Sequence, residues 1–188
     1  MHGTKVKCFT LRLDEREDID IGVYASKVAG SADSVAVLWS QASVLRIFSR
    51  ASKDLVLRKR IGNLPFDGGL CFLPDGRELA VAIGEAWDTF IAVYLLDGTF
   101  VRRFGEGVLC EASRMACSAA GEIVVVERVF GKFEDDQYFR DDDRHVVVFD
   151  AFGDVATKTV LGKFSQDVAV LGDAVLECDA WGHFYWLR

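Results

Sequence analysis

The chain has 188 residues, of which 51% are hydrophobic and 27% are charged, and its formal net charge at pH 7 is −7. This composition excludes a disordered chain and fits one domain of ordinary size. No apolar run approaches the ~20 residues that span a bilayer, and a negative chain lacks the cationic surface that nonspecific binding to nucleic acid or acidic membranes requires.

The N-terminus and the cysteines indicate a reducing compartment. The first residues become charged before the core of a signal peptide could form. The cysteines are odd in number and show no CxxC spacing, so we expect reduced and mostly buried thiols rather than disulfides, in a cytoplasmic protein. They are Cys8, Cys71, Cys110, Cys117 and Cys178.

The first half of the chain predicts one possible edge strand and two units of four strands. Residues Lys5–Leu13 alternate in character, and residues 18–62 form the first unit, which ends in the basic run Arg58–Arg60. Its strand candidates are Val23–Ala25, Val35–Trp39, Val44–Phe48 and Leu55–Ile61. Residues 63–105 form the second unit, with strands at Gly68–Leu73, Leu79–Ile83, Phe90–Leu95 and Phe100–Phe104. Its turns at Pro74–Arg77 and Leu96–Thr99 contain Asp-Gly pairs, a strong hairpin signal.

The second half repeats the pattern with one strand missing. Residues 106–162 contain turns at Gly121 and Gly153 and predict strands at Ser113–Cys117, Ile123–Val126, His145–Phe149 and Val155–Leu161. Residues 163–188 supply three strands, at Val168–Leu171, Ala174–Cys178 and Phe184–Leu187.

Repeated four-strand units with dry inner strands and a wet outer strand are typical of a β-propeller. We therefore predict an all-β propeller of about four blades, in which residues 4–13 close the last blade by covering its unpaired edge. Alternatives are a partial arc of a larger, six-bladed propeller, a ring shared by two copies, or another β architecture. A closed ring of four blades would have a narrow channel, consistent with small residues at Ala36, Ala80, Ala82 and Ala92.

The second unit resembles an NHL repeat, a β-propeller family. The resemblance rests on Gly69–Phe72, Pro74–Arg77, Leu79–Ala82, Phe90–Tyr94 and Asp97–Gly105. The third unit is similar through residues 120–125 and 146–150, so that about half the chain is covered. The Asn-His-Arg stretch of the family's third strand is absent, and the resemblance implies the architecture rather than a particular activity.

Residues suited to catalysis are few. The three histidines, His2, His145 and His183, show no spacing that places two imidazoles on one metal. We expect His145 to be a solvated histidine at the end of a strand. No nucleophile elbow, P-loop or Cys-His pair is present, so we predict no catalytic residue, no metal site and no cofactor.

The connections between the second and third strands of the units carry the distinctive side chains. One of them is an acidic, aromatic insertion within residues 133–144. Loops held by a rigid scaffold concentrate binding residues, and aromatic residues among charges are typical of interfaces. The alternatives are a solvated acidic loop and tryptophans packed between blades. The predicted binding residues are Trp39, Glu85, Trp87, Asp88, Phe133, Asp135, Asp136, Tyr138, Asp179 and Trp181.

These observations favour a noncatalytic module that binds a protein or peptide, as a monomer or possible homodimer, with no nucleic acid or membrane partner. The alternative is a propeller-type hydrolase or lyase that holds a divalent metal through carboxylates such as Glu85, Asp88 and Asp179. RNA binding ranks third, because the basic run Arg58–Arg60 lies on an outer strand away from the loops.

Overall fold

The structure, a computed structural model, contains strands and turns but no helix among the residues that it describes. These are residues 5–9, 15–20, 26–39, 43–51, 54–62, 68–85, 88–129, 133–134, 137–138, 143–161, 165–171, 174–179 and 184–187. Within these ranges no helix is long and apolar enough to cross a membrane.

Four antiparallel sheets follow one another along the chain, and we call them blades 1 to 4. Blade 1 consists of β3 (Lys27–Gly30), β4 (Ser34–Trp39), β5 (Val44–Ala51) and β6 (Asp54–Gly62). Blade 2 consists of β7 (Leu70–Phe72), β8 (Glu78–Glu85), β9 (Asp88–Leu95) and β10 (Phe100–Leu109). Blade 3 consists of β11 (Glu111–Cys117), β12 (Ile123–Val129), β15 (Asp143–Phe149) and β16 (Val155–Leu161). Blade 4 has three strands, β17 (Ser165–Leu171), β18 (Ala174–Asp179) and β19 (Phe184–Leu187).

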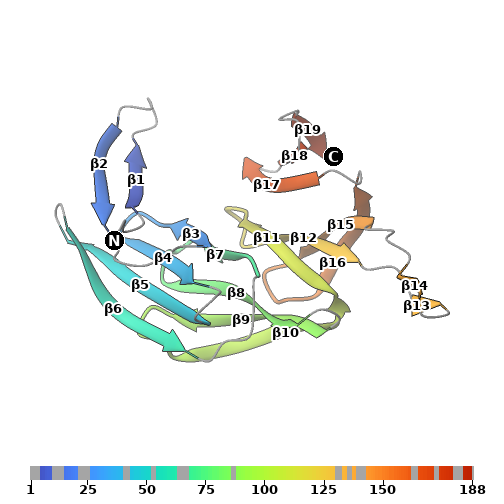
Figure 1. The fold of residues 1–188 in the computed structure, drawn as a ribbon, viewed down its shortest axis with the longest axis horizontal. Helices are drawn as coiled ribbons and strands as arrows, with labels where there is room; N and C mark the ends of the chain where they lie inside the picture. The colour runs from blue at the N-terminus through green and yellow to red at the C-terminus, as the bar shows by residue number, and fades with distance from the viewer. Residues whose placement is uncertain are drawn as a thin grey trace.

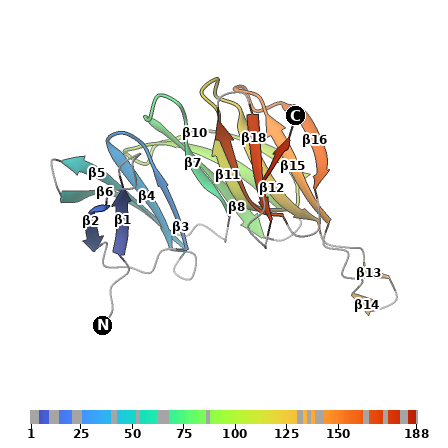
Figure 2. The ribbon, with the colours of Figure 1, turned by 90° about the horizontal axis from the view of Figure 1, so that it is seen from above.

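Two hairpins complete the described strands. The first pairs β1 (Lys5–Phe9) with β2 (Glu15–Asp20), and the second pairs β13 (Phe133–Glu134) with β14 (Gln137–Tyr138). The β13–β14 hairpin lies in the connection between β12 and β15 and projects beyond the blades in both views (Figures 1 and 2).

The blades stand around a common axis as an open arc (Figure 1). Their first strands contact one another in series, β3 with β7, β7 with β11, and β11 with β17, and each strand that follows lies next to its predecessor in the sheet. This arrangement confirms the predicted propeller with about four blades. The β1–β2 hairpin and blade 4 stand at opposite ends of the arc, with a gap between them (Figures 1 and 2).

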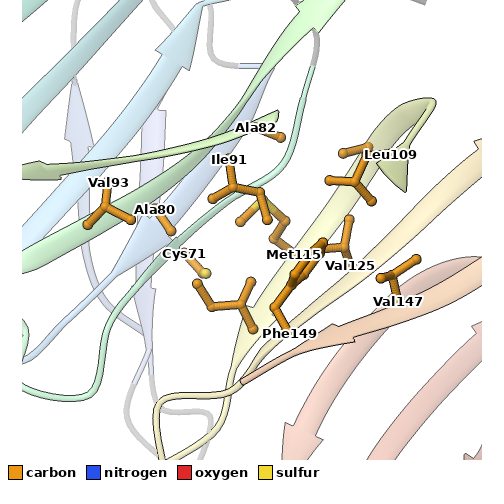
Figure 3. Packing of buried hydrophobic residues seen from close by; sticks show 12 residues of the cluster. Cys71, Ala80, Ala82, Ile91, Val93, Leu109, Met115, Val125, Val147 and Phe149 are labelled. Atoms are coloured by element: carbon orange, nitrogen blue, oxygen red, sulfur yellow. The ribbon is translucent and has the colours of Figure 1, made fainter. Parts of the chain in front are cut away.

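Apolar packing between neighbouring blades forms the core. A cluster between blades 2 and 3 combines Ile91 and Val93 with Met115, Val125 and Phe149 (Figure 3). A second cluster joins blades 1 and 2, and a third joins blades 3 and 4. Blade 2 contributes to two clusters because its alternate residues point to opposite faces of the sheet. For this reason β8 and β9 have near-continuous apolar runs rather than alternation.

Aspartates and glycines build the tight turns as the sequence predicts. Gly98 and Gly153 have φ angles of +85° and +99°, which favour glycine. The Oδ1 atom of Asp97 accepts a hydrogen bond of 2.8 Å from the N–H of Thr99, and Asp150 accepts three such bonds in its own turn. These backbone hydrogen bonds lower the pKa of both carboxyl groups, because they stabilise the charged form.

The prediction that the N-terminal strand closes the last blade is wrong. Strand β1 pairs with β2, and blade 4 keeps three strands. The register of the β1–β2 hairpin sets Lys5 opposite Asp20 and Lys7 opposite Asp18. A short hairpin loop costs less closure entropy than a loop spanning nearly the whole chain.

Two further details differ from the sequence predictions. The first strand of blade 1 is β3, at Lys27–Gly30, whereas the expected strand at Val23–Ala25 lies outside the described residues. The small residues assigned to a channel, such as Ala36 and Ala82, instead lie in the clusters between blades with no exposed surface. Small side chains there allow two sheets to approach closely.

Phe149 offers a direct test of the packing between blades 2 and 3. Its side chain is fully buried and contacts Phe104 edge-to-face, with ring centroids 5.2 Å apart. We expect Phe149→Ala to lower the free energy of unfolding by about 3–5 kcal/mol, because it removes buried apolar surface and leaves a cavity.

The matched control is Phe152→Ala, since the ring of Phe152 is 82% exposed only three residues later. Its expected effect is below about 0.5 kcal/mol. Urea denaturation of both variants measures the difference, and equal losses would contradict the assigned core.

Candidate functional site

The connections between the second and third strands leave the same edge of each blade, which we call the loop face. Trp39 is the last residue of β4, Glu85 is the last of β8, and Asp179 is the last of β18. Asp88 is the first residue of β9 and lies opposite Glu85, and the side chain of Asp88 is exposed. Strand order therefore brings the backbone positions of four of the predicted binding residues to one face.

The insertion of blade 3 supplies two more of these positions. Phe133 and Tyr138 are register partners in the β13–β14 hairpin. The other four predicted binding residues lie outside the described residues, and so does His183. The four are Trp87, Asp135, Asp136 and Trp181.

Gly84 shapes the loop face at blade 2. It lies opposite Thr89 and has a φ angle of +146°. A Cβ atom at this position would lie 2.1 Å from the carbonyl oxygen of Asp88, so no side chain fits. The absence of a side chain lets β8 and β9 approach closely next to the connection that Glu85 and Asp88 flank.

A buried ionic cluster lies beneath the loop face between blades 2 and 3. The side chain of Glu127, on β12, has no exposed surface. Its Oε1 atom lies 2.6 Å from Nζ of Lys158 on β16 and 3.0 Å from Nδ1 of His145 on β15. Its Oε2 atom accepts a hydrogen bond of 3.0 Å from the backbone N–H of Cys110.

This cluster fixes the crossover from blade 2 to blade 3. Lys158 also donates a hydrogen bond of 3.2 Å to the carbonyl oxygen of Val108. Blade 3 thus binds the crossover backbone at Val108 and at Cys110. A buried carboxylate is stable only when it is paired and hydrogen-bonded, and Glu127 meets both conditions.

The prediction for His145 is wrong, and Glu127 was missed. Only 18% of the His145 side chain is exposed, because it packs beside Glu127 rather than in solvent. The period-two pattern contains a signal for this cluster. Ile123, Val125 and Glu127 share one face of β12, and the first two belong to the core, so the alternation puts a carboxylate where an apolar residue is expected.

Burial lowers the reactivity of three of the described cysteines. Cys71, Cys110, Cys117 and Cys178 form no disulfide with one another. Burial, and secondarily the charge of Glu122, raises the pKa of Cys117 to about 11. Burial also raises the pKa values of Cys71 and Cys110. A thiolate is the reactive form, so these three residues lack the activation that a nucleophile needs.

The opposite edge of the blades, which we call the turn face, contains a hollow of about 550 Å³ between blades 1 and 2. Phe72 and Leu96 contribute apolar surface to it, and Asp33, Asp75 and Arg77 contribute charge. The sequence does not indicate this hollow, because it forms where turns of two separate blades meet.

The described residues contain no group of three or more His, Cys, Asp or Glu side chains arranged to hold a metal ion. The carboxylate oxygens of Glu127 contact a lysine, a histidine and a backbone N–H instead. The contacts of the Glu127 cluster therefore join blades 2 and 3.

Glu127→Gln tests that role. The neutral amide would leave the Lys158 ammonium without its carboxylate, so we expect a loss of about 3 kcal/mol in the free energy of unfolding. The control is Glu106→Gln, which removes the exposed 3.0 Å ion pair with Arg103 and should cost less than about 1 kcal/mol. Chemical denaturation measures both, and equal effects would contradict the assignment.

Comparison with known proteins identifies the fold. No protein-family model matches the sequence, and no curated protein matches it. Hydrazine synthase of Kuenenia stuttgartiensis is 19% identical with a TM-score of 0.66, over 94% of this chain and 51% of that one. The Dos1 propeller is 12% identical with a TM-score of 0.61, over 97% of this chain and 49% of that one. The WD40 domain of Neurospora crassa Pan2 is 10% identical with a TM-score of 0.61, over 97% of this chain and 55% of that one. The chain spans about half the length of these structures, and its fold is that of a β-propeller.

Proposed function

We propose that this chain is a noncatalytic β-propeller module whose loop face binds a protein or peptide. The observation that carries the proposal is the shared edge at which Trp39, Glu85 and Asp179 end their strands. A set of loops on one face of a rigid scaffold is the usual arrangement of a binding surface.

The charge of these connections indicates the chemistry of the partner. Glu85 and Asp88 flank one connection, and Asp179 precedes another. In the insertion of blade 3, residues 134–136 and 141–143 are all acidic. Complementary charge steers encounter and excludes partners of like charge. We therefore propose a basic segment as the partner.

Aromatic residues in the same connections would provide the apolar contacts. Trp87, Trp181, Phe133 and Tyr138 occur among these charges. Tryptophan and tyrosine are enriched among the residues that dominate binding energy, and arginine is their frequent counterpart. A partner with Arg or Lys next to an apolar side chain fits this combination.

A peptide selection on the whole chain tests the proposal. Random twelve-residue peptides displayed on phage are selected for binding, and the affinities of the selected peptides are measured by fluorescence anisotropy. We expect enrichment of Arg and Lys, and a weakening of at least about tenfold in the Trp87→Ala/Trp181→Ala variant, since hot-spot residues exceed about 1.4 kcal/mol each.

The matched control changes the other face of the molecule. Asp33→Ala/Asp75→Ala alters two exposed carboxylates of the turn-face hollow and should leave binding unchanged. Thermal melts of every variant separate loss of binding from loss of folding. Binding that survives the tryptophan changes but fails in the turn-face variant would overturn the proposed loop face.

The metal-dependent alternative makes a different prediction in the same protein. A stoichiometric Ca²⁺ or Zn²⁺ site that includes Glu85, Asp88 and Asp179 would raise Tm by mass action. The noncatalytic proposal expects no such rise. Cytoplasmic location and the resemblance to NHL repeats remain parts of the proposal.

A further inference from the structure

The outer strands of the three four-stranded blades each have one edge without a described pairing strand. These strands are β6, β10 and β16. An open edge exposes unpaired backbone N–H and C=O groups and can pair with another chain. Natural proteins commonly protect such edges with charged side chains, lysine in particular, or with irregular backbone.

Two of the three edges carry these protections. Strand β6 contains the run Arg58–Arg60, and β10 contains Arg102 and Arg103. The backbone of β10 is also irregular, because Gly105 and Gly107 have positive φ angles and the register shifts between Phe104 and Leu109.

The edge of blade 3 is the least protected of the three, because β16 carries one charged residue, Lys158, and its register with β15 shifts only near its start, at Ala156. Strand β16 has the sequence VATKTVL, and its first six residues are exposed. Val155 is 44% exposed and Val160 is 66% exposed, while Phe152 in the preceding turn is 82% exposed. This strand combines β-branched residues with a single charge, which is the composition of a strand prone to pairing.

The single charge on β16 is already neutralised within the molecule. The Nζ atom of Lys158 lies 2.6 Å from the buried Glu127 carboxylate and donates a hydrogen bond to the carbonyl oxygen of Val108. The ammonium group is therefore directed across the sheet towards blade 2. A lysine held in this way does not repel a strand that approaches the edge.

The amino-acid sequence of β16 is nearly symmetric about Lys158. Thr157 and Thr159 flank it, Ala156 and Val160 follow, and Val155 and Leu161 end the strand. We propose that β16 pairs antiparallel with β16 of a second copy of this chain. A two-fold axis at Lys158 sets each threonine opposite the other threonine of the second copy, a favourable cross-strand pair.

Pairing about this axis also sets the two Lys158 residues opposite each other. Like charges in that position normally destabilise a strand pair. Here each ammonium is compensated by its own Glu127 at 2.6 Å. The buried cluster thus removes the one charge that would prevent pairing, and the same geometry that joins blades 2 and 3 leaves the edge of blade 3 available.

A single seven-residue strand makes a small interface. Interfaces of this size are at the weak end of the range for specific association, so we expect a dissociation constant of about 10–500 μM. The paired edge lies on the outside of the arc, away from the loop face. The dimer is thus a property beyond the proposed peptide binding, and it leaves that face accessible.

Sedimentation velocity of the whole chain tests the proposal over about 1–500 μM, the range that brackets the expected dissociation constant. The average mass should rise from 20.8 kDa towards twice that value. The variants Thr157→Lys/Thr159→Lys and Thr157→Glu/Thr159→Glu change exposed positions, and each alone should remain monomeric because like charges then face each other. An equimolar mixture of the two should form a heterodimer, since every lysine then faces a glutamate.

The matched control is Val101→Lys, which adds a charge to the 42% exposed position on the outer strand of blade 2 and should leave the dimer unchanged. Circular dichroism confirms that each variant is folded. A chain that stays monomeric to about 500 μM overturns the proposal. A dimer that persists in both charged variants, or a mixture that fails to associate, overturns it as well.

Discussion

The structure depends on the need of each sheet to bury both of its faces. Alternate residues of β8 illustrate this need, because Ala80 and Ala82 belong to the cluster towards blade 3, whereas Leu79 and Val81 belong to the cluster towards blade 1. A sheet that is apolar on both sides requires a neighbour on each side. Radial stacking of blades satisfies this condition for every inner blade, and it directs all the connections to the two edges of the arc.

The Glu127 cluster adds a polar element to an otherwise apolar contact between blades. Its carboxylate lies at the end of the Ile123–Val125 face, where the core meets the loop face. Hydrogen bonds to the backbone at Cys110 and from Lys158 to Val108 define where the crossover passes. An apolar residue would fill the same space without selecting that backbone position, so the cluster provides positional definition that hydrophobic packing lacks.

Local signals allowed much of the architecture to be predicted. The Asp-Gly turns at Asp75–Gly76 and Asp97–Gly98 form as expected, because their conformation depends on residues within the turn itself. The strands of blades 2 and 3 follow from apolar runs bounded by those turns. Strand β3 has a weaker pattern, because Lys27–Gly30 contains small and charged residues, and the sequence did not indicate it.

The features that depend on distant partners could not be predicted in this way. Residues 4–13 could pair with a nearby strand or with the distant last blade, and in the structure β1 pairs with the nearby β2. The contact of Glu127 with Lys158 joins strands separated by the whole insertion. The turn-face hollow likewise exists only because turns of two blades are neighbours. The backbone positions of Trp39, Glu85 and Asp179 were easier to predict, because they depend only on repetition of one strand order.

Methyl nuclear Overhauser effects between blades test the radial stacking of the apolar sheet faces most directly. Radial stacking predicts cross-peaks between Ile91 and Met115, which share the cluster of blades 2 and 3 in Figure 3, and between Leu45 and residues of blade 2 such as Val81. The register partners Val125 and Val147 provide the reference within one blade. Cross-peaks confined to pairs within single blades would contradict the radial stacking of apolar faces.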